Sequence, residues 1–536
     1  MRCHWGFLLL WTTIPAGISE EHFLSVRQQV ILCVAAIEAL LCINLANTRP
    51  HFMPCRDLVR ETLQRIRAMT QAGDFGATGD GQTDDTEALQ HAIDEGIGEL
   101  LLPRGDYRIT RSLIVDLARV GRTSIRGESG TARILMQGRG PAILLKGTHT
   151  TTAAPDGFRD SEWTHERMPM ISQLEIVGEH AEADGIRIEG VMQPTVTGVL
   201  LRKLRHGIHL TGRARNVLIS HCHVYHNTGV GVFLDGLNLH QTIISASHIS
   251  YCRLGGIRIE RSEIRNLQIT GNDIEYNNNG GHKVPDADGV PTAEIWLDAS
   301  EGSIREGTIC SNTIQATYSP NGANIRIIGQ PQEKNAKVGM LAITGNLIGS
   351  QWNNIHMTAA QGVTITGNSI YSGHNRNMLI EECSQIVMGD NCFGHNADYG
   401  VERELCTGVT LRKCRDSIFS GNILQDCLSG RHLYPEAPEL QREALLELYE
   451  CSNIILSNNQ ILDSAPYGIR LADCTDITMN AITVSDRRVP PLQKSAVYWT
   501  GETGQSIVNA CRFDGSLDKS FVSEAITSRS GCIGCD

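Results

Sequence analysis

Most of the chain consists of short segments in which apolar and polar residues alternate, each ending at a glycine, an asparagine or another small residue. A period of two predicts β-strands with one buried face. One phrase recurs: an alternating strand, a small residue, asparagine, and a β-branched or apolar residue. Its copies are LQITGNDI, GTICSNTI, LAITGNLI, VTITGNSI, IVMGDNCF, SIFSGNIL, IILSNNQI and DITMNAI. They place Asn272, Asn312, Asn346, Asn368, Asn391, Asn422, Asn459 and Asn480 in one slot, which Cys222 and Ser247 fill in two earlier copies.

Neighbouring copies are about 20 to 25 residues apart, and larger steps indicate inserted loops. One such repeat is too short to bury its own core, whereas stacked repeats share a continuous core. The pattern therefore predicts an all-β solenoid, a right-handed parallel β-helix. Asparagine in the same slot of every coil predicts a ladder of stacked amides, so we assign these residues a structural role. Cys383, Cys414, Cys451 and Cys474 also share one register and predict a buried column of small side chains.

A second phrase, with copies such as GGIRIE, AEIWLD and ANIRII, assigns the two faces of one sheet. Its isoleucines and leucines point inward, so the residues between them point outward. The outward pairs are Arg187/Glu189, His209/Thr211, Phe233/Asp235, Arg258/Glu260, Trp296/Asp298, Arg326/Ile328, His356/Thr358, Leu379/Glu381 and Arg470/Ala472.

The front of the repeat region carries a family signature. DFGATGDG at residues 74–81 leads into TDDTEALQ at 83–90 and then into GELLLPRGDYRI at 98–109. This resembles the N-terminal signature of the pectate-lyase/polygalacturonase superfamily, which implies a β-helix closed by a capping helix. We expect Thr83 or Asp84 to cap that helix. The superfamily includes polysaccharide lyases, glycoside hydrolases, epimerases, fructotransferases and phage tailspikes. The catalytic motifs of polygalacturonases and alginate epimerases are absent, so no family site is carried over.

Three acids, Asp235, Glu260 and Asp298, form the main candidate site. They should lie in one row on successive coils, about 4.8 Å apart. Glycosidases use two carboxyl groups about 5 to 9 Å apart, and crowding of like charges raises the pKa of one of them. Phe233, Arg258 and Trp296 in the next column could bind sugar rings and hydroxyls. The alternative is a solvated charged ladder in which Arg258 and Arg261 are salt-bridge partners of the acids.

A polar, glycine-rich insertion follows the same coils and contributes His282 and Lys283, while Asp286 and Asp288 in it could bind an ion. Arg326 and His356, on the coils beyond, could hold a substrate carboxylate or sulfate. A mobile surface loop and an incidental histidine are the corresponding structural alternatives.

These residues favour a carbohydrate-active enzyme, with a glycoside hydrolase using Asp235, Glu260 and Asp298 as the first hypothesis. A lyase or epimerase acting on a uronate polymer is the second, with a base such as His282 or Lys283 and with arginine support. A non-catalytic glycan-binding β-helix is the third. The hydrolase would require no cofactor, whereas a lyase could use calcium. The expected partner is a polysaccharide; a net charge of −12 argues against nucleic acid. No stable membrane insertion is expected, and the oligomeric state is left open.

We divide the chain into a leader at 1–70, a cap and first coil at 71–112, a β-helix at 113–510 and a C-terminal tail at 511–536. The leader has two apolar stretches and is a signal, an anchor or a misassigned start. A polymer-degrading enzyme meets its substrate outside the cell, so we expect a secreted, periplasmic or cell-surface protein. The 17 cysteines are an odd total and do not decide the compartment.

Overall fold

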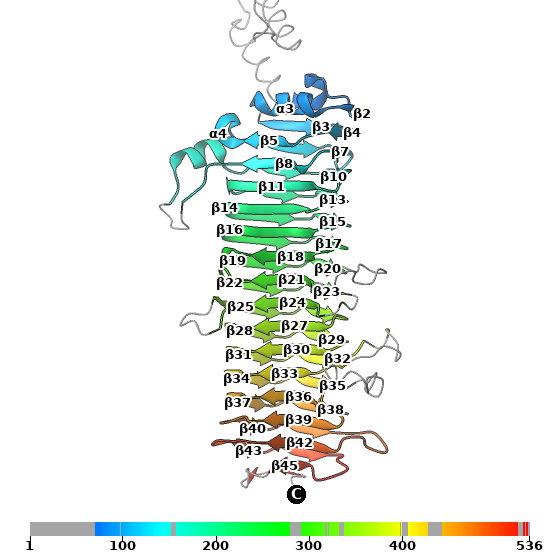
Figure 1. The fold of residues 1–536 in the computed structure, drawn as a ribbon, viewed down its shortest axis with the longest axis vertical. Helices are drawn as coiled ribbons and strands as arrows, with labels where there is room; N and C mark the ends of the chain where they lie inside the picture. The colour runs from blue at the N-terminus through cyan, green and yellow to red at the C-terminus, as the bar shows by residue number, and fades with distance from the viewer. Residues whose placement is uncertain are drawn as a thin grey trace, which may run out of the picture.

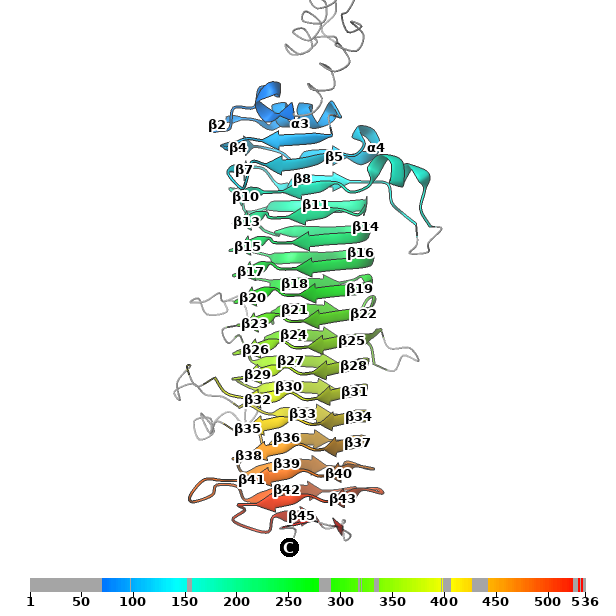
Figure 2. The ribbon, with the colours of Figure 1, turned by 180° about the vertical axis from the view of Figure 1, so that it is seen from behind.

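The computed structural model describes residues 70–536 except 97, 152–156, 279–290, 317–318, 320, 332–336, 397, 399–405, 427–441, 524–528, 531 and 534–536. His282, Lys283 and the leader up to residue 69 therefore lie outside the described residues. The described chain forms a long stack of coils in which strands of successive coils pair in parallel (Figures 1 and 2). The predicted right-handed parallel β-helix is confirmed.

Three strands make up most coils, so the solenoid has three faces. The first face carries the outward pairs of the second phrase. Its strands are β5 (Leu113–Asp116), β8 (Gly140–Lys146), β11 (Ala183–Met192), β14 (Ile208–Ser220), β16 (Val230–Ser245), β18 (Gly255–Glu260), β21 (Ala293–Asp298), β24 (Ala323–Ile328), β27 (Asn353–Thr358), β30 (Arg376–Glu381), β33 (Val409–Arg412), β36 (Ala444–Tyr449), β39 (Tyr467–Ala472), β42 (Ser495–Thr500) and β45 (Phe521–Ser523).

The second face follows the first along the chain, and β14 and β16 bend around the corner to join both faces. Its other strands are β1 (Thr70–Gln71), β3 (Glu99–Leu102), β6 (Ser124–Gly127), β9 (Met170–Ser172), β12 (Thr195–Thr197), β19 (Glu263–Thr270), β22 (Ser303–Cys310), β25 (Val338–Thr344), β28 (Gln361–Thr366), β31 (Ser384–Gly389), β34 (Arg415–Ser420), β37 (Ser452–Ser457), β40 (Thr478–Asn480), β43 (Ile507–Asn509) and β46 (Arg529–Ser530).

Within the described residues, the third face is a separate sheet of 16 short strands. They are β2 (Asp80–Asp84), β4 (Gly105–Ile109), β7 (Ala132–Met136), β10 (Leu174–Gly178), β13 (Leu200–Arg202), β15 (His223–Tyr225), β17 (His248–Ser250), β20 (Asp273–Glu275), β23 (Thr313–Gln315), β26 (Leu347–Gly349), β29 (Ser369–Tyr371), β32 (Cys392–Gly394), β35 (Ile423–Gln425), β38 (Gln460–Leu462), β41 (Thr483–Ser485) and β44 (Arg512–Asp514).

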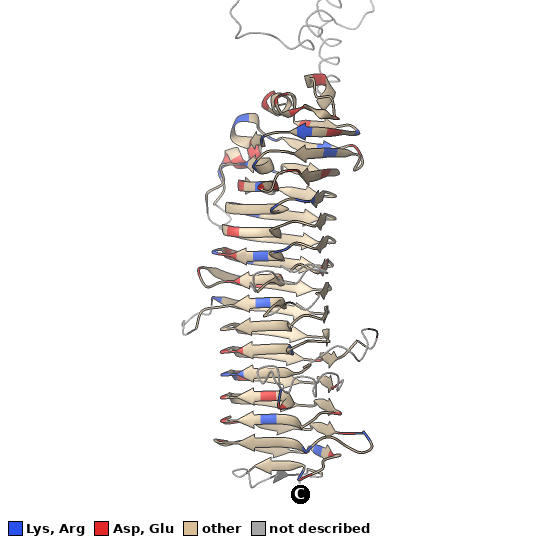
Figure 3. Ribbon diagram, turned by 45° about the vertical axis from the view of Figure 1, so that its right-hand side comes forward, with Lys and Arg blue, Asp and Glu red and all other residues tan. Residues whose placement is uncertain are grey.

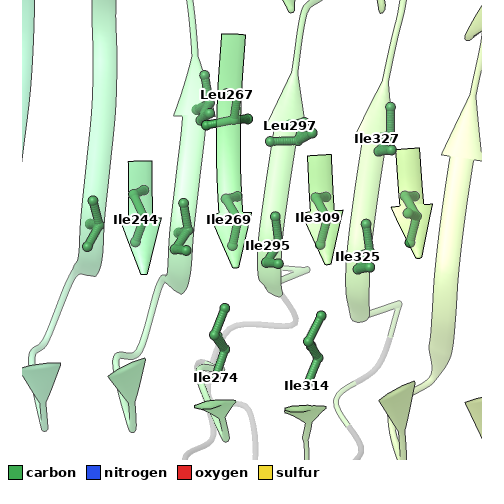
Figure 4. Packing of buried hydrophobic residues seen from close by; sticks show 14 of the residues in the cluster. Ile244, Leu267, Ile269, Ile274, Ile295, Leu297, Ile309, Ile314, Ile325 and Ile327 are labelled. Carbon is green, nitrogen blue, oxygen red and sulfur yellow. The ribbon is translucent and has the colours of Figure 1, made fainter. Parts of the chain in front are cut away.

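The core runs the length of the stack and consists mainly of isoleucine and leucine. Ile295 of the first face lies over Ile325 of the next coil, and Ile274 of the third face over Ile314. Figure 4 shows such side chains from the three faces repeated at the same positions on successive coils, and all four are completely buried. Burying one such side chain contributes about 1.5–3 kcal/mol, so the shared core supplies the main stabilisation.

The asparagine slot forms the predicted ladder from Asn272 to Asn459. In each step the side-chain Nδ2 and the backbone N–H donate to the Oδ1 of the next asparagine. The Nδ2–Oδ1 distances are 2.9–3.1 Å. Ser247 and Cys222 extend the same slot, since the N–H of Ser247 donates to Asn272 and that of Cys222 to Ser247. These amides satisfy buried polar groups at the tight turn between the second and third faces.

Asn480 does not belong to this ladder, and its assignment to the slot was wrong. Gln460 pairs with Thr483, which places Ile482 next to Asn459 in the slot. Asn480 lies two residues earlier, on β40, where it pairs with Ser457. A shift of two residues preserves the alternation of inward and outward side chains, so the pattern of apolar residues does not detect it.

A short helical segment closes the N-terminal end of the stack (Figure 1). It comprises η2 (Ala72–Phe75) and α3 (Thr86–Asp94), with Leu89 and Ile93 of α3 completely buried. The expected cap residues need correction, because the helix begins after Asp85. The Asp85 carboxylate accepts hydrogen bonds from the N–H groups of Thr78 and Gly79. Asp84 accepts from the N–H of Thr86 at 3.1 Å. The signature acids thus have structural roles.

Two further helical segments, α4 (Leu117–Val120) and η3 (Glu162–Glu166), project from one side of the first coils. At the other end the coils continue past residue 510, where the sequence placed the start of a tail. There β44 pairs with β41, β45 with β42 and β46 with β43. The final strands are short and carry little alternation, which explains why the pattern did not reveal them.

The cysteine column is as predicted. Cys383, Cys414, Cys451 and Cys474 are buried and are free thiols. Each thiol lies near backbone carbonyl oxygens, for example Cys451 Sγ at 3.3 Å from the Tyr449 oxygen. Burial raises the pKa of Cys383 to about 12, so this thiol stays protonated. The column fills the corner between the first and second faces.

A second corner lies between the third and first faces, and Glu294 is a completely buried carboxyl group there. Asn324, Asn354 and Asn377 form a short amide ladder there, with Nδ2–Oδ1 distances of 3.0 and 2.8 Å. Glu294 occupies the same position on the preceding coil and is 0% exposed. It accepts hydrogen bonds from the backbone and side-chain amides of Asn277, yet burial raises its pKa well above the usual 4.5.

Asn391→Ala should destabilise the fold markedly. It leaves the buried backbone N–H of Asn368 without a partner, at about 1–3 kcal/mol. It also removes one hydrogen bond from Asn368 Nδ2, which still donates to the Ile343 carbonyl oxygen, and one from Asn422 Oδ1, which still accepts the backbone N–H of residue 391. Asn480→Ala is the matched control and should lower the melting temperature far less. Equal losses in thermal unfolding would contradict a stabilising ladder.

Glu294→Gln should make stability less dependent on pH. The folded state raises the pKa of Glu294, so its contribution is fully present below the unfolded pKa of about 4.5 and is lost as pH rises toward the folded value. Glutamine keeps an acceptor oxygen and carries no charge. The variant should therefore gain melting temperature over the wild type at about pH 8 and not at about pH 4. A gain of the same size at both pH values would exclude titration of Glu294 as the cause.

Candidate functional site

The acid row lies on three successive strands of the first face. Asp235 of β16 aligns with Glu260 of β18. Arg258 aligns with Trp296, and Ile259 with Leu297, which places Asp298 of β21 next in the row. The predicted register of the row is therefore present, with adjacent coils about 4.8 Å apart.

Arginines hold two of the three acids. Arg261 Nη2 is 2.7 Å from Glu260 Oε1, and Arg261 Nε donates to Asp235 at 3.0 Å. Arg258 donates to the other oxygen of Glu260 at 2.7 Å. Acidic and basic positions are interspersed along the whole solenoid (Figure 3). The carboxyl groups of Asp235 and Glu260 are therefore both held in ion pairs with guanidinium groups.

Asp298 differs from the other two acids. Its Oδ1 accepts a hydrogen bond from the N–H of Ser300 at 2.9 Å, and it makes no ion pair with a described residue. Asp298 is therefore the acid of the row that no described guanidinium group holds.

Trp296 lies between two guanidinium groups. Arg258 is 4.6 Å and Arg326 is 5.2 Å from its ring centre. Cation–π contacts of this kind are strongest where water is excluded. The ring therefore serves as packing for two cations, and its indole Nε1 is buried without a hydrogen-bond partner.

Arg326 is a buried cation without a matching acid among the described residues. Only 9% of the residue is exposed, and its guanidinium donates to the carbonyl oxygen of Asn321 while its Nε has no partner. Burial lowers the pKa of Arg326 to about 10, so the group is still charged at neutral pH. A buried charge without a counter-ion is costly, and an anionic ligand group would compensate it.

Two histidines that the sequence reasoning did not select lie at the other end of the row. His209 Nε2 is 3.8 Å from Asp235 Oδ2, and its ring stacks on Phe233 with centres 5.2 Å apart. His206 lies 5.1 Å from Phe233, and its Nδ1 accepts the N–H of Val230. Burial lowers the pKa of His206 to about 4 and that of His209 below its usual value. Both imidazoles are therefore neutral near pH 7 and can accept protons.

An ion pair between a buried acid, Asp184, and the exposed Arg205 stands next to these histidines. Asp184 is 3% exposed and accepts two hydrogen bonds from Arg205 and one from the N–H of His206. His209 could have been selected from the sequence, since it shares the outward column of Phe233. His206 and Asp184 lie in turns or at strand starts, where alternation gives no signal.

The remaining candidates are dispersed. Phe233 is 8% exposed and covered by the two imidazoles, so it offers no open platform for a sugar ring. His356 aligns with Arg326 on the next coil, but its Nε2 is 2.9 Å from Glu381, whose pKa it lowers. The structure thus brings Asp235, Glu260, Asp298, Arg258, Trp296 and Arg326 together and pairs His356 elsewhere.

No set of three or more His, Cys, Asp or Glu residues in the described part of the chain is placed to hold a metal ion. In the same described residues, no helix has the length and apolarity that a membrane span requires.

Two protein-family models match the chain. A right-handed β-helix region matches residues 170–294, and the family described as periplasmic copper-binding protein (NosD) matches residues 300–510. Copper prefers thiolate, thioether or imidazole ligands. Within the second match the Cys383 thiol is buried and protonated, Cys414, Cys451 and Cys474 are stacked in the core, and His356 is bound to Glu381. The described part of that match also holds no group of three or more His, Cys, Asp or Glu residues that could bind a metal ion, so its described residues do not fit a copper site.

Two curated proteins are similar to the chain in sequence. The chain is 24% identical over 396 residues to the uncharacterized protein YclG of Bacillus subtilis (strain 168), covering 67% of this chain and 62% of that protein. It is 56% identical over 41 residues to alginate lyase 7 of Azotobacter vinelandii, which is 7% of this chain and 5% of that protein. The chain thus spans less than two thirds of the length of either relative.

Among solved structures, tailspike protein 3 of bacteriophage CBA120 has a TM-score of 0.48 and 13% identity, over 89% of this chain and 70% of that one. The A-module of a mannuronan C-5 epimerase of Azotobacter vinelandii has a TM-score of 0.44 and 14% identity, over 82% and 99%. The coil geometry and the right-handed β-helix family model agree on the fold, a right-handed parallel β-helix, and the N-terminal signature resembles that of the pectate-lyase/polygalacturonase superfamily.

Proposed function

We propose that the protein binds an acidic polysaccharide along the first face and cleaves it. The observation that carries this proposal is Arg326, a buried guanidinium beside Trp296 with no acid partner among the described residues. A carboxylate on the polymer would supply the missing counter-charge. The match to a periplasmic family supports export, which suits a polymer outside the cell.

β-Elimination fits this site better than hydrolysis does. In that chemistry a base removes the proton α to a uronate carboxyl, and cations stabilise the resulting anion. His209 is a neutral imidazole next to Asp235, and Arg258 and Arg261 lie on the adjacent strand and turn. Asp235 and Glu260 would then act by orienting these groups rather than by donating protons.

Hydrolysis is the second candidate, and Asp298 is the observation that favours it. Asp298 lies in the row beside Glu260 and, unlike Glu260, forms no ion pair with a described residue. It could serve as the acid, with Glu260 as the base or nucleophile. We expect that a hydrolase would need no cofactor, whereas a lyase could use calcium.

Arg326→Gln should weaken binding of an acidic polymer while changing kcat little. Loss of a charge-assisted hydrogen bond costs about 1.5–3 kcal/mol, or roughly a tenfold to hundredfold rise in KM. Arg470→Gln is the matched control, because Arg470 is in the same outward column but is bound to Glu443. A panel of uronate and neutral polymers, followed by product analysis, provides the substrate. Equal KM values for the two variants would count against the anion subsite.

His209→Asn should separate the two reactions. If His209 is the base of an elimination, the variant should lose about 10²–10⁴-fold in kcat, and the wild type should form unsaturated products that absorb in the ultraviolet. Asp298→Asn should then retain most activity. New reducing ends without unsaturated ends, together with inactivity of Asp298→Asn, would establish hydrolysis instead. Binding without either product over the whole panel would leave a non-catalytic glycan-binding protein.

A further inference from the structure

The second face contains a groove of about 480 Å³ that the reaction proposed above does not use. It crosses four coils, from β19 over β22 and β25 to β28. Pockets of this size commonly hold ligands of one or two rings. The groove is open to solvent, and it lies on a different sheet face from the acid row.

The groove exists because side chains on these coils are small. One outward column contains Gln268, Thr308, Ala342 and Thr364 on successive coils and continues with Val387, Ile418 and Ile455. The three later residues are 37–39% exposed. On their own coils they occupy the surface position that Ala342 and the two threonines leave open in the groove. The hollow is therefore a local departure from the repeat.

A second column of outward residues lies beside the first and also ends in a position with little side-chain volume. Asn266, Glu306, Met340 and Gly362 occupy the left-handed bend of each coil, with φ of 55°, 62°, 52° and 68°. The last of these positions has no side chain, so the groove is open at that end. Gly307 forms the floor: a Cβ there would come within 3.0 Å of Leu341 and 3.1 Å of the Leu267 carbonyl oxygen.

The lining has an apolar floor and a polar rim. Leu267, Leu341 and Ala342 line it together with Met340, which is 55% exposed. Amide and hydroxyl groups of Asn266, Gln268, Thr308 and Thr364 surround this surface. Of the described residues that line the groove, Glu306 alone is ionisable, and it is an acid. Such a surface suits a ligand with one apolar face, many hydroxyl donors and no negative charge.

We propose that this groove is a binding site for an uncharged sugar unit, one or two rings long, distinct from the first face. The apolar C–H face of a pyranose would lie on Met340 and Ala342, and its hydroxyls would bond to the amides and to Glu306. Glu306 repels anionic sugars, so the groove selects against the acidic units that Arg326 attracts. This site does not depend on the proposed reaction, because it requires only binding.

The test uses the full-length protein labelled with ¹³C at the methionine methyl groups, with the Met340 signal assigned through Met340→Leu. Linear tetrasaccharides of glucose, galactose and mannose are titrated separately, and an oligouronate tetramer is titrated in parallel. At least one neutral tetrasaccharide should shift the Met340 signal in a saturable manner, and the oligouronate should not. Absence of any saturable shift with all three neutral probes would overturn the proposal.

Thr308 points outward, so Thr308→Trp places a large ring in the groove. The variant should bind the neutral tetrasaccharide with an affinity lower by about tenfold or more. Ile455→Trp is the matched control: it lies in the same column outside the groove and should bind as the wild type does. Unchanged affinity in Thr308→Trp, or an oligouronate that binds more tightly than the neutral probes, would also overturn the proposal. Polymer cleavage measured on the same variants should stay at the wild-type level, which separates this site from the first face.

Discussion

Parallel pairing between successive coils is the interaction on which the whole structure depends. A single coil has three short strands and cannot bury its own apolar side chains. Each coil becomes stable only when its isoleucines lie over those of its neighbours, as Ile295 does over Ile325. The same stacking brings polar groups into the interior at the corners. The asparagine ladder supplies their hydrogen bonds, and because each amide bonds to the next coil, it also fixes the register of the stack.

Register in turn decides what the surface can do. Because successive outward residues form columns, a run of acids in the sequence becomes a row of carboxylates, and an arginine one residue past the strand reaches two of them. The row is thereby a bound network of charges rather than a set of independent proton donors. Because Arg258 and Arg261 pair with two of the acids, Asp298 and Arg326 are the charged groups of this region that form no ion pair with a described residue. His209 lies at the edge of the network, next to Asp235.

Three features of the molecule arise where a single coil or a few coils depart from the repeat. At the corner between the third and first faces, most coils have a small or amide residue. One coil instead has the buried Glu294. In one outward column of the second face, several coils have valine or isoleucine. Three coils have threonine or alanine there, and these smaller side chains leave a groove. Arg326 is similarly an exception, because Arg258, His356 and Arg470 in the same column are bound to acids. A solenoid tolerates such exceptions because each coil contacts only its neighbours.

The sequence by itself determined the fold, the inward and outward assignment of side chains, the register of Asp235, Glu260 and Asp298, and the cysteine column. These follow from periodicity, which depends on backbone geometry alone. It did not determine that Asn480 lies outside the ladder, because a shift of two residues preserves alternation. Nor did it show that Asp85 precedes α3, that Arg326 is buried without an acid partner among the described residues, or that His206 covers Phe233. It offered Arg258 and Arg261 as partners of the acids only as an alternative to an open catalytic row, and the structure shows this pairing. The tertiary structure decided these points, since burial and charge pairing depend on which side chains meet across coils separated by loops of unequal length.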